Sequence, residues 1–276
     1  MNVIDNFLEK MNNLPMLPKV VQEVIELLNK DDVDFKAVAD KINHDQVLAA
    51  RVLRMSNSAY FGCSRAVKTI EDAISLIGTQ NLKTLVVASG VTATFTSVPG
   101  LDLKRFWQHS LITASIARQL SKELGFDPEV AYISGLIHTI GQLPIHLVFP
   151  ATSAEVEEVC KGRSVLERKN VEFTLLGLDH CQIGEKVAKL WKFPDEILRV
   201  IRYYAEPTHL AACNLAPVVY AAAHIAFDLE QDKEPKYIAE TLDTEVASRL
   251  TLTDVNYLAD KIESYRPFVA EAKSYL

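Results

Sequence analysis

Residues 106–143 read FWQHSLITASIARQLSKELGFDPEVAYISGLIHTIGQL, and this stretch predicts two consecutive helices. In its first half, apolar residues recur at steps of three and four, which places them on one face of a helix. His109 lies on that same face, so we expect its side chain to point toward the interior. Gly125 can end the helix, because glycine readily adopts the left-handed conformation that closes many helices.

The second helix of the stretch begins at Asp127 and Pro128, which suit the N-cap and the first helical turn. We expect it to extend to about Ile140, just before Gly141. Its residues are apolar on nearly every side, which is typical of a buried helix. His138 lies inside it, so the sequence predicts histidines on two neighbouring buried helices.

The composition is that of a globular helical protein. The chain has 276 residues, of which 49% are hydrophobic and 24% charged, enough to bury a sizeable core. Helical periodicity dominates, so we predict an all-α fold. The net charge of −7 argues against general nucleic-acid binding and against an anionic membrane surface. No apolar run approaches the ~20 residues of a spanning helix, so we expect no membrane insertion.

The cysteines and the first residues bear on the cellular compartment. Cysteines occur at Cys63, Cys160, Cys181 and Cys213 and form no Cys-x-x-Cys pair. We therefore expect small buried thiols rather than a zinc ribbon or a redox centre. The first residues are polar and acidic, which is not the pattern of a secretory signal peptide. We expect a protein of a reducing, bacterial-type cytoplasm.

The clearest break in the first half of the chain runs from Ser97 to Gly100, where a proline precedes a glycine. We therefore predict two packed helical lobes, one of residues 1–98 and one of residues 99–276. In the first lobe, helices are expected at 3–12, from 18, from 34 to 42, from about 45, and on both sides of Gly78. In the second lobe, beyond the two helices above, they are expected at 151–161, 164–170, 179–191, from 194 and at 217–229.

Three segments of the first lobe carry a family resemblance: LPMLP at 14–18, INHDQVLAARVLRMSNSAYFG at 42–62 and TIEDAISLIGTQNLKTLVV at 69–87. In this order they resemble the opening of the HDOD family, over roughly residues 14–210. That family joins such a lobe to an HD-like helical bundle that lacks the full catalytic set. Gln46 stands where the family usually has proline, which should alter only the start of a helix.

The second lobe resembles the HD superfamily of metal-dependent phosphohydrolases. Those enzymes have a histidine on one helix and a His-Asp pair on the next, typically within HDIGK. Here the motif reads His138-Thr139-Ile140-Gly141-Gln142, so a threonine replaces the aspartate and a glutamine replaces the lysine. Matched by motif, the metal ligands of that superfamily correspond to His109, His138, His180 and His224, while Tyr203 and Tyr204 fall where two adjacent histidines often occur.

The missing aspartate bears on metal binding and on catalysis. A carboxylate neutralises a divalent cation, whereas Thr139 offers a neutral hydroxyl, so Mg²⁺ or Mn²⁺ should bind weakly. Imidazoles suit zinc or nickel, so His109, His138, His180 and His224 could hold such an ion in a remnant site, without the protein requiring a cofactor. The alternative is that they are hydrogen-bonded core histidines inherited from an enzyme.

The resemblance and the missing aspartate together favour a non-catalytic signalling or regulatory protein of HDOD type. Its relatives are often joined to receiver or cyclic-dinucleotide domains, and this chain has no room for either. We therefore expect it to act in trans, on a signalling protein or through a small ligand. The alternative function is an HD-type phosphohydrolase that acts on a nucleotide or a cyclic dinucleotide. A third hypothesis is a sensor that binds a nucleotide-like ligand in the former active-site pocket.

A loop predicted at residues 56–65 is the candidate partner surface of the first lobe. It combines Asn57, Tyr60, Phe61 and Arg65. Aromatic residues and arginine are favoured at the centre of interfaces. The alternative is that Tyr60 and Phe61 pack between the lobes and only hold them together.

Overall fold

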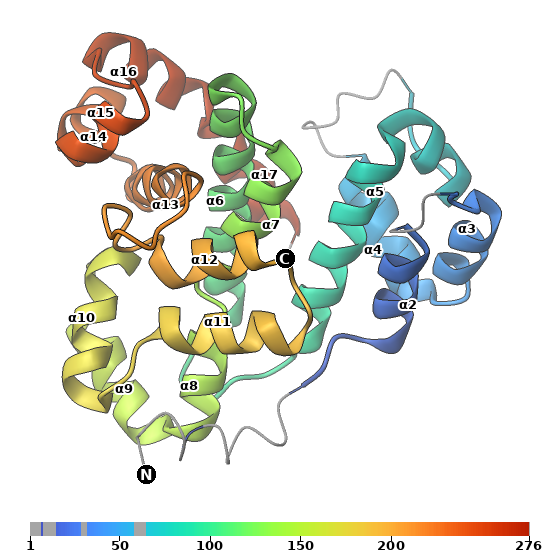
Figure 1. The fold of residues 1–276 in the computed structure, drawn as a ribbon, viewed down its shortest axis with the longest axis horizontal. Coiled ribbons are helices and arrows are strands. Elements are labelled where there is room, and N and C mark those ends of the chain that lie inside the picture. The colour runs from blue at the N-terminus through green and yellow to red at the C-terminus, as the bar shows by residue number, and fades with distance from the viewer. Residues whose placement is uncertain (1–6, 8–14, 29–31, 58–64, 276) are drawn as a thin grey trace. The chain divides into compact units, whose positions relative to one another are not determined.

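The computed structural model describes residues 7, 15–28, 32–57 and 65–275 (Figure 1). Within these ranges all regular elements are helices and no strand occurs, which confirms the predicted all-α class. None of the helices in the same ranges is both long and apolar enough to cross a membrane.

The described residues form two compact units, one within Pro15–Thr96 and one that comprises residues 97–275 together with Phe7. The sequence had assigned all of residues 1–98 to the first lobe. Phe7 gives a physical reason for the difference. Its side chain is completely buried, and its ring centroid lies 5.8 Å from that of Phe149 in the larger unit.

The smaller unit contains α2 (Lys19–Leu28), α3 (Phe35–Asn43), α4 (Gln46–Ser56) and α5 (Ile70–Thr94). The side chains of Asp34, Asp45 and Thr69 accept hydrogen bonds from backbone N–H groups in the first turns of α3, α4 and α5. Gly78, with φ of 79°, interrupts α5 where the sequence predicted the end of one helix and the start of another. The buried core includes Val24, Val38, Ile42, Val52, Ile70 and Leu82.

The larger unit is built around α6 (Leu103–Leu124), which contacts α7 (Pro128–Ile137), α13 (Ala216–Glu230) and α17 (Arg266–Tyr275). Between α7 and α13 the chain forms α8 (Gln142–Val148), α9 (Pro150–Val159), α10 (Val165–Leu176), α11 (His180–Leu190) and α12 (Asp195–Tyr203). Between α13 and α17 lie α14 (Pro235–Thr241), α15 (Thr244–Arg249) and α16 (Val255–Ser264). Figure 1 shows α11 and α12 as neighbours, and the two helices are in contact.

The connection from α6 to α7 follows the local signals in the sequence. Gly125 closes α6 in the left-handed conformation, with φ of 78°. Asp127 caps α7 by accepting hydrogen bonds from the backbone N–H groups of Glu129 and Val130, and Pro128 occupies the first turn. These features confirm the predicted helix boundary.

The end of α7 differs from the prediction, since the helix stops at Ile137 rather than near Ile140. Residues 138–141 form tight turns instead, with a hydrogen bond of 2.9 Å from the N–H of Gln142 to the carbonyl of Thr139. The cause lies outside the segment, in α11. A β-carbon on Gly141 would lie 2.0 Å from the carbonyl oxygen of His180, so the turn needs glycine to approach α11 this closely.

Candidate functional site

His109 and His138 are brought together by the close packing of α6 against α7. Gly135 of α7 approaches the backbone of Ala114 in α6 so tightly that a β-carbon there would lie 2.8 Å from the Ala114 Cα. The ring centroids of His109 and His138 are consequently 5.5 Å apart. His109 is 8% exposed, and His138 is completely buried.

Each of these two imidazoles is held through one nitrogen only. The Nδ1 of His109 donates to the Oε2 of Glu230 at 2.6 Å, and the Nδ1 of His138 donates to the carbonyl of Gly135 at 2.6 Å. Both Nε2 atoms are buried and have no hydrogen-bond partner among the described residues. Burial, followed by the electrostatic influence of the neighbouring His109, holds the pKa of His138 well below its ordinary value, so His138 is neutral.

His180 differs, because both of its ring nitrogens are occupied. It is the first residue of α11, which Asp179 caps. Its Nδ1 lies 2.6 Å from the Oε2 of Glu172, and its Nε2 lies 2.6 Å from the hydroxyl of Tyr204. The Tyr204 ring also packs edge-on against the ring of His138, at a centroid distance of 4.9 Å. His138 and His180 therefore both contact Tyr204, which occupies the position of an expected histidine, and His109 contacts His138.

Charge explains how His180 is fixed. Burial alone would lower its pKa, but the Glu172 carboxylate outweighs burial and raises the pKa to about 10. His180 is thus an imidazolium that donates from both nitrogens. The backbone N–H of His180 donates to the same carboxylate oxygen at 2.7 Å. Glu172 and His180 form an ion pair in which both side chains are completely buried.

The ion pair continues outward through further charged side chains. Arg168 donates to Glu172 at 2.7 Å and lies 2.6 Å from a carboxylate oxygen of Glu157. Burial opposes ionisation of Glu157, but the hydrogen bond from His146 and the charge of Arg168 prevail and lower its pKa to about 2. We call Glu157, Arg168, Glu172, His180 and Tyr204 the buried charge network. Of these residues, the sequence analysis singled out only His180 and Tyr204. The four-residue spacing of Arg168 and Glu172 was a further signal, because residues so spaced on a helix can form an ion pair.

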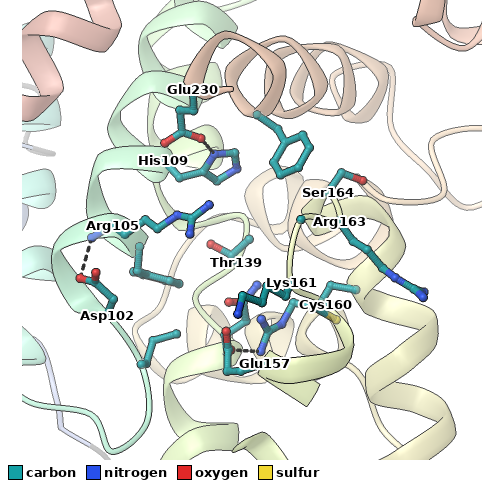
Figure 2. A pocket seen from close by; sticks show the side chains of 16 residues that line it. Asp102, Arg105, His109, Thr139, Glu157, Cys160, Lys161, Arg163, Ser164 and Glu230 are labelled. Carbon is teal, nitrogen blue, oxygen red and sulfur yellow. Dashed lines mark hydrogen bonds and ion pairs between the residues drawn. The ribbon is translucent and has the colours of Figure 1, made fainter. Parts of the chain in front are cut away.

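A pocket of about 260 Å³ opens beside His109 (Figure 2). It lies among the start of α6, the 138–142 turn, the 160–164 segment and the end of α13. His109 is the one predicted ligand that lines it. Arg105, Lys161 and Arg163, which the sequence did not single out, lie around it. The pocket is lined by Leu101, Asp102, Arg105, Phe106, His109, Thr139, Gln142, Glu157, Cys160, Lys161, Gly162, Arg163, Ser164, Arg168, Phe227 and Glu230.

His224 occupies a different environment from the other three predicted histidines. Its Nε2 lies 3.3 Å from the carbonyl of Ile238 and 3.3 Å from the hydroxyl of Thr241, both on α14. The residue of α13 that reaches the histidine cluster is Glu230, which contacts His109. The structure thus brings together His109, His138 and His180 and places His224 against α14.

A family model of the HDOD domain matches residues 14–207, close to the span of 14–210 predicted from the sequence. The chain belongs to the HDOD family. The crystal structure of a candidate phosphohydrolase from Shewanella amazonensis is similar to it, with 34% identity, a TM-score of 0.81, and coverage of 98% of this chain and 97% of that one. An HDOD domain protein with unknown function from Geobacter sulfurreducens shares 25% identity and a TM-score of 0.78, with coverage of 98% and 97%.

A curated relative is longer than this chain. An uncharacterized protein of Treponema pallidum is 24% identical over 203 residues, which are 73% of this chain and 39% of that protein. This chain therefore spans about two fifths of the length of the curated relative that it matches.

The donor atoms of this HDOD chain do not fit the metal centre of the related phosphohydrolases. No group of three or more His, Cys, Asp or Glu side chains is placed to hold a metal ion in the described part of the chain. Thr139 supplies no carboxylate, and both nitrogens of His180 are hydrogen-bonded. Two imidazole nitrogens remain, on His109 and His138, whereas structural zinc sites take four protein ligands and catalytic sites three.

The predicted partner surface of the smaller unit is only partly described, since Tyr60 and Phe61 lie outside the described residues. Asn57 uses its amide to clamp the backbone of Val67, with hydrogen bonds of 2.8 Å to both the carbonyl and the N–H group. Arg65 pairs with Asp72 at 2.8 Å while its side chain remains 63% exposed. Asn57 therefore ties the segment before α5 to the end of α4, and Arg65 stays accessible.

Proposed function

We propose that this HDOD protein is a non-catalytic signalling regulator, which acts in trans through a signalling protein or a small ligand. The observation that carries the proposal is the state of His180. Its two nitrogens are committed to Glu172 and Tyr204 inside the buried charge network, so the third histidine of the family pattern is a structural cation. To bind a metal ion, His180 would have to give up one of these two hydrogen bonds.

The chemistry of phosphoester hydrolysis supports the same conclusion. Metal-dependent hydrolysis needs cations that activate a water molecule and stabilise the developing charge on the phosphate. Thr139 provides no charge to hold such a cation, and neutral His138 offers one buried nitrogen. A regulator needs none of these groups, because its output is binding.

The second candidate function is a phosphohydrolase acting on a nucleotide or cyclic dinucleotide, and its support is the similarity to the candidate phosphohydrolase of Shewanella amazonensis. A turnover assay separates the two functions. The protein would be purified without added metal, analysed for bound metal, and incubated with p-nitrophenyl phosphate, AMP and cyclic di-GMP in the presence of Mg²⁺, Mn²⁺ or Zn²⁺.

We expect product formation no faster than for His138→Ala, which serves as the matched control because it removes the imidazole that contacts both His109 and Tyr204. Metal-dependent turnover in the wild type that disappears in His138→Ala would overturn the regulatory proposal. A Thr139→Asp variant would extend the test, since it restores the carboxylate while the nitrogens of His180 remain engaged. We expect it to stay inactive.

A further inference from the structure

We propose that the pocket beside His109 binds a phosphomonoester of mononucleotide size through Arg105 and Lys161, with Arg163 at its rim. This inference deepens the proposed function and rests on it, because the bound metabolite would be the signal that the regulator senses. It identifies the ligand by charge and size.

The first argument is that these three cations have no counter-charge. No side-chain partner of Arg105, Lys161 or Arg163 occurs among the described residues, and all three residues are exposed. The fourth cation of the pocket, Arg168, is by contrast held by Glu157 and Glu172. Figure 2 shows the Arg105 guanidinium reaching toward Thr139 and the side chain of Arg163 directed outward.

The second argument is that the acidic side chains of the pocket are already engaged. Glu230 accepts from His109, and Glu157 pairs with Arg168. Asp102 caps α6 by accepting from the backbone N–H of Arg105 at 3.0 Å. Burial is the main cause that raises the pKa of the Cys160 thiol, so this residue adds no negative charge to the wall. The lining carries four arginine and lysine side chains against three carboxylates, so an anionic ligand would meet an excess of positive charge.

The third argument comes from two buried polar atoms that lack partners. The Nε2 atoms of His109 and Gln142 are both buried without a hydrogen bond in the described residues, and both side chains line the pocket. Gln142 is 4% exposed and His109 is 8% exposed. Buried polar groups are nearly always hydrogen-bonded in folded proteins, so two orphans on one pocket indicate that a ligand or water completes them. The amide of Gln142 can donate to a phosphate oxygen, and the Nε2 of His109 is a second hydrogen-bonding atom on the same pocket.

Size and shape select a small phosphomonoester from among anions. Such a group carries about −1.5 to −2 charges at pH 7, which matches two or three cations. The volume of about 260 Å³ lies just below the range of ordinary small-molecule sites, so a long polyanion does not fit. Phe106, Phe227 and Leu101 provide an apolar wall for the organic part of the ligand.

Isothermal titration calorimetry on the full chain, in a phosphate-free buffer containing EDTA, tests the site. The probes are AMP, GMP, CMP and UMP, with adenosine and inorganic phosphate as comparators. We expect at least one mononucleotide to bind, adenosine to show no binding, and phosphate to bind more weakly than the mononucleotide. If phosphate binds as tightly, the site recognises the anion alone and the assignment of an organic ligand is wrong. If none of the four mononucleotides binds, the proposal is overturned.

Variants locate the binding. We expect Arg105→Gln and Lys161→Gln each to weaken mononucleotide binding by roughly tenfold, because each removes a charge-assisted hydrogen bond. Lys104→Gln is the matched control, since Lys104 is an exposed neighbour of Arg105 on α6 and does not line the pocket. Equal affinities in the wild type, Arg105→Gln and Lys161→Gln would place the ligand elsewhere and contradict the proposal.

The outcome is distinguishable from a failure of the proposed function. Binding is measured in EDTA and reports on the pocket alone, whereas turnover with added metal reports on catalysis. Mononucleotide binding together with metal-dependent hydrolysis would preserve the site and reject the regulator. If the protein shows no mononucleotide binding and no hydrolysis, the proposed site is rejected and the regulatory function stands, with a protein as its partner.

Discussion

The two ends of the histidine cluster differ in how completely they are satisfied. At one end, His180 has both ring nitrogens hydrogen-bonded and is paired with Glu172 inside the buried charge network. At the other end, His109 and His138 each keep a buried Nε2 without a partner in the described residues, and His109 lines the pocket. A satisfied group stabilises the fold, whereas an unsatisfied one retains the capacity to bind. The first end is therefore scaffold, and the second is where a ligand would act.

The substitution with the largest expected effect on stability removes Glu172, the counter-ion of His180. In Glu172→Ala, the charges of Arg168 and His180 lose a completely buried carboxylate. Breaking a buried pair costs about 3–5 kcal/mol, because an uncompensated charge remains in the interior. We expect the free energy of unfolding, measured in urea, to fall by that amount. The control is Glu158→Ala on the exposed face of α9, which should change it by less than about 0.5 kcal/mol. A small loss in Glu172→Ala would show that the network is not a scaffold.

The pH dependence of stability tests the charge of His180. Its pKa of about 10 in the folded protein lies above the ordinary value of 6.5, so the folded state binds the extra proton between these values. The stabilisation is complete below pH 6.5 and is lost as the pH rises through 10. Between pH 7 and pH 9 we expect the free energy of unfolding to decline by up to about 1.4 kcal/mol per pH unit. The decline should be largely absent in His180→Gln, and an identical slope in that variant would contradict the assigned imidazolium.

The smallest expected effect is at the unsatisfied end. His109→Gln removes the hydrogen bond from the imidazole to Glu230, which the new amide can replace only in part. One hydrogen bond contributes about 1 kcal/mol to stability. We expect urea unfolding to show a loss of about that size, well below the loss in His180→Gln. Mononucleotide affinity should fall in His109→Gln. If both substitutions destabilise the protein equally, the two ends of the cluster do not differ in the way proposed.

The helices were predictable because their boundaries depend on neighbouring residues. Asp127, Pro128 and Gly125 specify the turn between α6 and α7 through capping and a left-handed glycine, all within a few residues. The end of α7 was misplaced by three residues, because a contact with α11 decides it. The close approach of Gly141 to the carbonyl of His180 joins positions about forty residues apart, which local signals do not contain.

The candidate site likewise contains residues that the sequence identified and residues that it missed. The motif pattern singled out His109, His138 and His180, and the structure places His138 between His109 and Tyr204, with His180 hydrogen-bonded to Tyr204. It mapped His224 to the same site, but the face of α13 that meets α6 carries Glu230, and His224 contacts α14. The sequence also passed over Arg105 and Lys161, since isolated cations on helix starts and connecting segments are typical of any soluble surface.

The sequence by itself determined that this chain is helical, that it belongs to the HDOD family, and that an aspartate of the HD pattern is missing at Thr139. Only the tertiary structure decided which histidine nitrogens are occupied and which cations are without partners. The physical reason is that hydrogen bonds and ion pairs of this site join α6, α9, α10, α11 and α13 with Tyr204 at the end of α12. Whether a side chain is satisfied depends on partners that come from far along the chain, while helix formation and motif order are local.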